Sequence, residues 1–114
     1  MLRVVIAADV GLAINPKSIE AQLQGAAVDA MSTTLSAGIH IDAGAAREGS
    51  FADYRWLRMR HTPAEIQVHL VRSDNHVGGV GELGYPSAAA ALANAIARAT
   101  GTMPTQFPIL EGGA

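Results

Sequence analysis

Apolar side chains recur along this chain with two different periods, and these periods predict its strands and helices. Residues 3–9 (RVVIAAD) are β-branched and then small, which is typical of a buried strand. Residues 65–72 (EIQVHLVR) alternate between apolar and polar side chains, and residues 37–43 (AGIHIDA) do the same, so both segments are predicted to be strands. Residues 55–60 (RWLRMR) are predicted to form a short extended piece.

Two longer segments have the helical period. Asn15 can cap a helix and Pro16 suits its first position, so a helix is predicted over residues 16–36. Gly25 lies inside it at a cost of roughly 1 kcal/mol relative to alanine, for which the usual reason is close approach of another backbone or a ligand. A second helix, rich in alanine, is predicted over residues 86–100. The apolar stripe of the first helix consists of Ile19, Leu23, Ala26, Ala27, Ala30 and Leu35.

The order of these elements predicts the fold class. It reads strand, helix, strand, an optional short strand, strand and helix, which favours an α+β fold with two helices packed on a mixed or antiparallel sheet. At 114 residues the chain is predicted to form a single domain over residues 1–110. Residues 111–114 are expected to form a loose C-terminal tail.

Composition narrows the classes of function. A net charge of −2 gives no electrostatic reason to expect nucleic acid or an anionic membrane as a partner. The absence of cysteine excludes disulfides, thiol catalysis and iron–sulfur ligation by this chain. The apolar N-terminal stretch is too short for a membrane helix and lacks the features of a signal peptide, so a cytoplasmic location is expected. Aromatic residues make up only 4% of the chain, so the core should be built from small and aliphatic side chains.

The segment VGGVGELG, residues 77–84, combines a glycine-rich loop with one acid, Glu82. Glycines let a backbone approach a bulky group, and a carboxylate on such a loop suits a general base or a ligand contact. The alternative is an exposed acid near the start of the second helix, where the helix dipole favours negative charge. Gln22 is open to a similar choice, because it is either a solvated helix residue or a donor to a ligand packed on the helix.

Other constellations are weaker. GVGELG, residues 79–84, fits the letters of a dinucleotide-binding loop, but that motif requires a further strand after the helix, and Glu82 would repel a pyrophosphate. The histidines lack metal-ligand spacing, and no residues are assigned as metal ligands. Asp9 and Asp42 lie near strand ends, where they are interpreted as turn or capping groups and not as a catalytic pair.

Four motifs in order resemble one known family, the large subunit of the molybdenum hydroxylases, which includes xanthine dehydrogenase and aldehyde oxidase. The type that the chain resembles most is the isoquinoline 1-oxidoreductase beta subunit. The resemblance extends from about Val4 to Pro108 and covers the C-terminal part of that subunit. The motifs are DVGLAINPKSIEAQLQGA (9–26), FADYRWLR (51–58), EIQVHLV (65–71) and GGVGELGYPSAAAALANAIARATG (78–101).

This resemblance implies roles for particular residues. Glu82 matches the family's catalytic base, which deprotonates a molybdenum-bound hydroxyl group that attacks an electron-poor carbon of an aldehyde or N-heterocycle. Gln22 matches a glutamine that lies against the molybdopterin. Gly79, Val80 and Gly81 match the loop that brings the base under the cofactor. The chain departs from the family at Gln24, where glutamate is common, and at the pair Tyr85-Pro86, where the family often has two prolines.

The resemblance also implies partners. The family's other cofactor contacts lie upstream of the matching region, so a molybdenum cofactor, expected in a dinucleotide form, would be bound only when a partner chain completes the site, and not by this chain alone. The implied partners are an upstream large-subunit chain and an iron–sulfur subunit. Two alternatives stay open: a non-catalytic detached domain that self-associates as a homo-oligomer or serves as an interaction module, and an unrelated nucleotide-binding module built on GVGELG.

Overall fold

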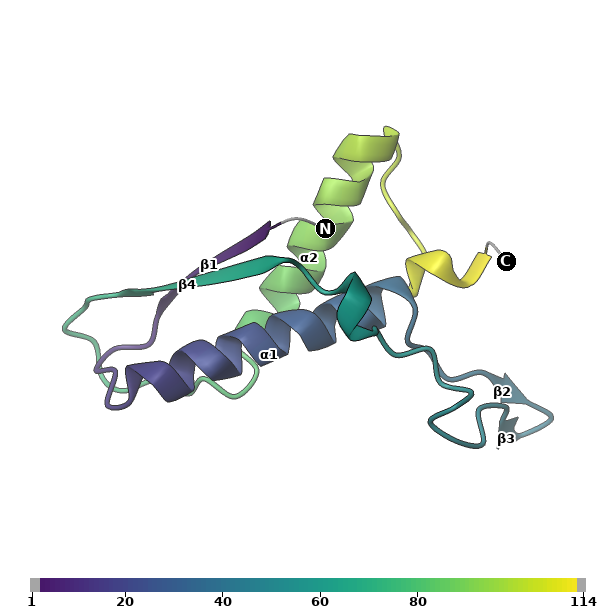
Figure 1. Cartoon of the computed structure of the whole chain (residues 1–114), viewed down its shortest axis with the longest axis horizontal. Helices are drawn as coiled ribbons and strands as arrows, with labels where there is room; N and C mark the ends of the chain where they lie inside the picture. Colours follow the sequence, from purple (N-terminus) through teal and green to yellow (C-terminus); the bar gives the residue numbers. More distant parts are fainter. Residues whose placement is uncertain (1–2, 113–114) are drawn as a thin grey trace.

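The computed structural model describes residues 3–112, with side chains up to residue 110 (Figure 1). Its elements, in chain order, are β1 (Arg3–Asp9), α1 (Pro16–Leu35), β2 (Ile41–Asp42), β3 (Ala45–Ala46), the 3₁₀ helix η1 (Met59–His61), β4 (Glu65–Val71), α2 (Gly84–Thr100) and the 3₁₀ helix η2 (Ile109–Gly112). The α+β class predicted from the sequence is confirmed. None of the helices within this described part is long and apolar enough to cross a membrane.

The main sheet consists of β1 and β4, which run parallel. Their register pairs Arg3 with Glu65 at one end and Asp9 with Val71 at the other. A parallel pair needs a crossover connection, and here residues 10–64 make it, with α1 in its first half and β2, β3 and η1 in its second half. Because the carboxyl ends of both strands meet at one edge, the loops that follow them, residues 10–15 and 72–83, leave the sheet side by side.

Helix α1 covers one face of this sheet. Leu23 is fully buried and packs with Ala8 and Val10, and the partly buried side chains around them include Ile6 and Val68. The side chains on the other face alternate with these and stay open, as the exposed fraction of 51% at Val5 shows. The strand predicted over residues 3–9 forms, but the prediction that it is buried is wrong for its open face, because a helix covers only one side of the pair.

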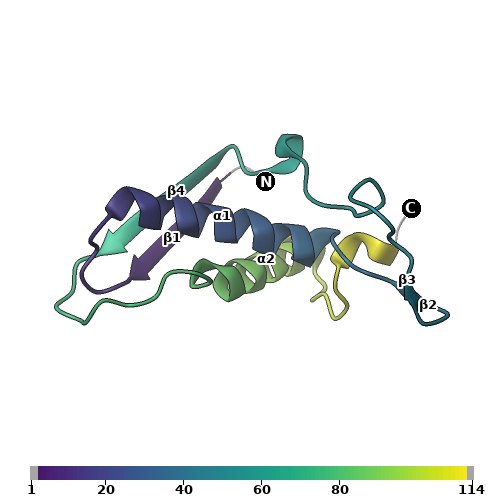
Figure 2. The ribbon, with the colours of Figure 1, turned by 90° about the horizontal axis from the view of Figure 1, so that it is seen from below.

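Helix α2 packs on α1 and not broadly on the sheet (Figure 2). The contact is built from alanines, as the composition predicted: Ala27, Ala30 and Ala88 form one buried cluster. The Thr33 and Tyr85 hydroxyl groups lie 2.6 Å apart and join the two helices by a hydrogen bond. Small side chains let the helix axes approach closely, which suits a core with few aromatic residues.

The helix boundaries follow the signals in the sequence. The Asn15 side chain accepts a hydrogen bond from the Ser18 N–H at 3.2 Å and caps α1, with proline in the first turn. Helix α2 begins at Gly84, two residues before its predicted start. It ends at Thr100, and the capping residue Gly101 has a left-handed φ of 78° and donates its N–H to the Ala97 carbonyl.

Two strand predictions need correction. Within residues 37–43 only Ile41 and Asp42 form a strand, and they pair with Ala45–Ala46 in a separate antiparallel hairpin. Within residues 55–60 no strand forms, and the last two residues belong to η1. The apolar alternation at residues 37–43 meets no covering layer, so Ile39 and Ile41 are 56% and 70% exposed. Alternation indicated a half-buried strand, but burial depends on neighbours that local sequence does not specify.

Candidate functional site

Two loops come together at the carboxyl end of the main sheet, and most of the predicted site residues lie there. One loop, residues 10–15, connects β1 to α1, and the other, residues 72–83, connects β4 to α2. The Gly78 N–H donates to the Val10 carbonyl at 2.9 Å and joins the two loops. The glycine-rich segment therefore lies against the start of α1.

Gln22 connects the first helix directly to this segment. Its side-chain Nε2 donates to the Gly81 carbonyl at 2.7 Å, although the two residues are 59 positions apart in the chain. That carbonyl belongs to the peptide unit that leads into Glu82, so the hydrogen bond restrains the backbone immediately before the predicted base. The structure thus brings Gln22, Gly81 and Glu82 into one place.

Glu82 lies two residues before α2. Its backbone carbonyl accepts the Tyr85 N–H at 3.0 Å and closes the turn that starts the helix. Its side chain is exposed, and its carboxylate makes no hydrogen bond or ion pair with any other described residue. The carboxylate therefore lies near the positive end of the α2 dipole, where it can meet a group from outside this chain.

A groove of about 410 Å³ lies beside the Gln22–Gly81 contact. Gln22, Val80 and Gly81 line it, together with apolar side chains such as Leu12, Ile14 and Val77. Gly79 and Glu82 do not line it, although each is the sequence neighbour of a lining residue. Only part of the predicted site therefore lies in the groove itself. A largely apolar hollow with a few polar groups is the usual form of a small-molecule site, and this volume lies within the common range of roughly 300–1,000 Å³.

The open backbone donors of the glycine-rich segment, in and next to this groove, suit a polar heterocycle. Among residues 3–112, the N–H groups of Gly79, Val80 and Gly81 make no backbone hydrogen bond. A Cβ built on Gly79 or Gly81 would meet no atom within 4 Å, so the surface of the loop is open to a bulky group. The part of the chain that the structure describes contains no cluster of three or more His, Asp or Glu residues that could hold a metal ion. These residues fit the edge of a pterin-type ligand and do not form a protein-ligated metal site.

Asp9, at the end of β1, was interpreted from the sequence as a turn or capping group, but it does more. Its carboxylate accepts hydrogen bonds from the Gly11 N–H at 3.0 Å, the Ser73 hydroxyl at 2.5 Å and the Asn75 side-chain nitrogen at 2.8 Å. The Ser73 hydrogen bond, followed by those from Gly11 and Asn75, holds the pKa of Asp9 below its usual value against the opposing effect of desolvation. An aspartate two residues before a glycine signals a turn, but nothing in that signal indicates the partners more than 60 residues away.

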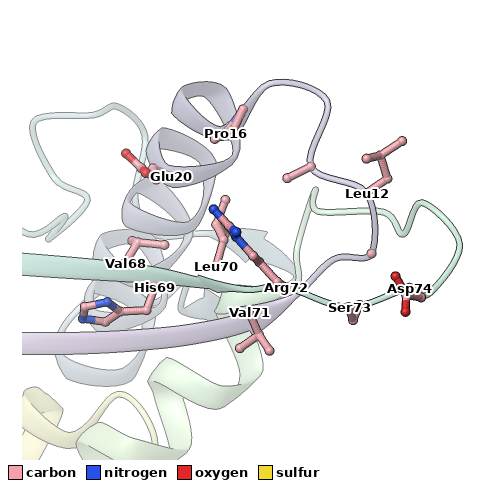
Figure 3. A pocket seen from close by; sticks show the side chains of 12 residues that line it. Leu12, Pro16, Glu20, Val68, His69, Leu70, Val71, Arg72, Ser73 and Asp74 are labelled. Atoms are coloured by element: carbon pink, nitrogen blue, oxygen red, sulfur yellow. The ribbon is translucent and has the colours of Figure 1, made fainter.

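A second and larger hollow, of about 760 Å³, lies between β4 and the first turn of α1 (Figure 3). Its lining includes Glu20, His69 and Arg72, and none of the residues predicted for the site lines it. Size alone therefore does not make it the better candidate, since Gln22, Val80 and Gly81 of the predicted set line the smaller groove.

Comparison with known proteins decides the family. The molybdopterin cofactor-binding domain family matches residues 1–63, which is more than half of the chain. The chain belongs to this family. Helix α1, with Gln22, lies within the matched region. The loop of residues 72–83, called the Glu82 loop below, lies beyond it.

Individual relatives agree with this membership. The chain is 36% identical over 107 residues to the isoquinoline 1-oxidoreductase beta chain of Brevundimonas diminuta, an alignment that covers 94% of this chain and 14% of the relative. It is 31% identical over 107 residues to a nicotinate dehydrogenase subunit of Pseudomonas putida, covering 94% of this chain and 9% of that protein. The resemblance to the molybdenum hydroxylase large subunit is confirmed.

A solved structure supports the fold. The crystal structure of a Cu,Mo-CO dehydrogenase in its carbon-monoxide-reduced state matches with a TM-score of 0.72 and 25% identity. The match covers 82% of this chain and 12% of that chain. The domain thus spans 14% of the isoquinoline 1-oxidoreductase chain and a smaller share of the other two proteins. Most of each relative lies outside the matched region.

Proposed function

We propose that this domain forms part of a molybdenum-dependent hydroxylase that oxidises a carbon atom of an aldehyde or N-heterocycle. In this proposal Glu82 is the catalytic base, and Gln22 with Gly79, Val80 and Gly81 contacts the molybdopterin. The observation that carries it is the hydrogen bond from Gln22 to the Gly81 carbonyl, since it joins two separately predicted site segments beside the predicted base. Membership of the molybdopterin cofactor-binding family supports the assignment.

The residues of this chain have separate tasks in that site. The Gln22 amide and the open N–H groups of the glycine loop would hold the polar edge of the cofactor, proposed in its dinucleotide form. When bound, the cofactor would supply a molybdenum centre that accepts the electron pair removed from the substrate. Glu82 would accept a proton at its carboxylate, and a covering chain that excludes water would make that transfer productive.

We infer that the site is completed by the remainder of a large subunit and by an iron–sulfur subunit. Three features of the chain support this: the predicted base is exposed, the groove is open on one side, and the domain spans 14% of its isoquinoline 1-oxidoreductase relative. A ligand of dinucleotide size is normally enclosed on most of its surface. The domain by itself is therefore expected to be inactive.

The test is reconstitution with the upstream part of a large subunit and an iron–sulfur subunit of the isoquinoline 1-oxidoreductase type. Glu82→Gln should lower kcat by roughly 10²- to 10⁴-fold while the molybdenum content of the complex stays the same, because only proton transfer is lost. Glu65→Gln is the control, since Glu65 is an exposed acid at the opposite end of β4. A Glu82→Gln complex with full kcat and full molybdenum would refute the proposal.

A second candidate, a non-catalytic domain that self-associates, is favoured by exposed apolar side chains. Phe51 is 91% exposed, Met59 is 90% exposed and Ile14 is 79% exposed, so large apolar side chains are available for contact with a partner. Sedimentation of the purified domain, together with molybdenum analysis by mass spectrometry, separates the two functions. A metal-free homo-oligomer that does not bind the upstream large-subunit chain would favour the second candidate function.

A further inference from the structure

The Glu82 loop is attached to the β1–α1 side of the molecule at four successive points. Ser73 and Asn75 donate to Asp9, the Gly78 N–H donates to the Val10 carbonyl, and the Gly81 carbonyl accepts from Gln22. Glu82 follows the last of these attachments directly. The first two both depend on one carboxylate, that of Asp9.

The loops also touch through their backbones. Gly11 has a left-handed φ of 66°, and a Cβ built on it would lie only 2.1 Å from the His76 carbonyl oxygen. This approach leaves no room for a side chain at position 11. The Asp9 side chain holds the residues on both sides of the contact, because it binds the Gly11 N–H and the side chain of Asn75, the neighbour of His76.

We propose that Asp9 is a positioning residue, whose carboxylate holds residues 73–81 against the β1–α1 loop and so determines where Glu82 is presented. The catalytic consequence rests on the function proposed for Glu82, whereas the holding of the loop does not. A carboxylate suits this task because it only accepts hydrogen bonds and here receives three. An asparagine of the same shape would turn an N–H₂ group towards at least one of these donors.

A purely local role for Asp9 gives a different expectation. An aspartate that only shapes the turn after β1 would affect residues 9–11 and leave the distant loop unchanged. The hydroxyl of Ser73 and the amide of Asn75 lie 64 and 66 positions away in the chain, so the positioning role predicts an effect there. The lowered pKa of Asp9, caused first by Ser73, agrees with a carboxylate held in its ionised form by these donors.

Amide hydrogen exchange of the whole chain, resolved by NMR, tests this without any cofactor. In Asp9→Asn the Gly78 amide should exchange roughly tenfold faster, since its hydrogen bond to Val10 loses the neighbouring attachment. The Ala27 amide inside α1 should keep its rate. Asp42→Asn is the matched control, because Asp42 is also an exposed aspartate at a strand end, but its carboxylate makes no hydrogen bond to another described residue.

An unchanged Gly78 rate in Asp9→Asn would overturn the proposal. If Asp9→Asn instead destabilises the whole domain, so that the Ala27 amide also exchanges faster, the variants Ser73→Ala and Asn75→Ala test the positioning role. Each removes one donor on the loop side and leaves Asp9 in place. Faster exchange confined to residues 76–83 in either variant supports the positioning role, and unchanged exchange in both overturns it.

The reconstituted enzyme separates this inference from the proposed function. Asp9→Asn should lower kcat several-fold with little change in KM, since it misplaces the base but removes no residue proposed to contact the cofactor. Asp9→Glu should restore part of the loss. If Glu82→Gln has no effect on activity, the proposed function fails, while the exchange result still decides the role of Asp9. If Glu82→Gln abolishes activity but Gly78 exchanges normally in Asp9→Asn, the function holds and the positioning role fails.

Discussion

At the scale of single residues, two glycines in helices have opposite surroundings. A Cβ on Gly84, at the start of α2, would lie 3.3 Å from both the carbonyl oxygen and a side-chain methyl group of Leu23. A Cβ on Gly25, inside α1, would meet no atom within 4 Å. Gly84 thus allows the helices to touch, whereas the close approach expected at Gly25 is not made by the described residues.

These surroundings predict opposite effects on stability. Gly25→Ala should raise the free energy of unfolding by about 1 kcal/mol, because alanine has the better helix propensity and the site is open. Gly84→Ala should lower it by roughly 1 kcal/mol or more, since Leu23 is fully buried and its backbone cannot move aside. Urea unfolding of both variants measures the difference, and a Gly84→Ala protein as stable as Gly25→Ala would contradict this packing of the two helices.

At the scale of elements, the β2–β3 hairpin depends on polar contacts more than on a core. Its strands are exposed, and Glu48 beyond β3 accepts hydrogen bonds from the His40 N–H at 2.8 Å and from the His40 ring at 2.5 Å. Arg47 also lies beside it, with its Nε 3.9 Å from the carboxylate, and Asp53 and Arg55 line the same hollow as Glu48. The His40 N–H and then its ring lower the pKa of Glu48 from 4.5 to about 2.

This shift predicts how the hairpin responds to acid. A carboxyl group with a lowered folded-state pKa stabilises the structure above its ordinary value of 4.5, and this contribution is lost as the pH falls towards about 2. The His40 and Arg47 amide resonances should therefore shift towards disordered values between these limits, before the α1 resonances change. Glu48→Gln should remove this separate transition, and its persistence in that variant would assign the transition to another group.

At the scale of the whole molecule, the domain is elongated, and one face of its main sheet has no covering layer. It measures 51 × 34 × 25 Å, and the segment with β2 and β3 extends well away from the body formed by the two helices and the main sheet (Figure 1). One sheet face is open, and large apolar side chains such as Phe51 are exposed. The buried core instead centres on Leu23 and on alanines of both helices.

This division predicts that stability and assembly respond to different residues. Leu23→Ala should lower the free energy of unfolding of the domain by roughly 2–5 kcal/mol, because it leaves a cavity in a fully buried position. Phe51→Ser should change it by less than about 0.5 kcal/mol, since the ring is 91% exposed. Phe51→Ser should instead weaken binding to the rest of the large subunit, measured by calorimetry. Unchanged binding would exclude Phe51 from that interface.

Local sequence determined the elements that depend on neighbouring residues. The β-branched run of β1, the alternation of β4 and the Asn15-Pro16 signal predicted these elements within a residue or two, because strand period and capping act over a few positions. The motif around Glu82 was likewise visible, and it contributed to the resemblance that the alignment with the isoquinoline 1-oxidoreductase subunit confirmed over 107 residues. The role of Glu82 as base stays a prediction.

Only the tertiary structure decided which distant groups meet. Local periodicity does not specify that β1 and β4 pair in parallel, and that pairing brings residues 10–15 and 72–83 to one edge of the sheet. The hydrogen bonds of Gln22 to Gly81 and of Asp9 to Ser73 follow from it, across 59 and 64 positions. Residues 37–43 failed as a strand for the same reason, since alternation indicates two faces but not whether another layer covers one of them. Contacts between distant segments arise when elements pack, and no short pattern records them.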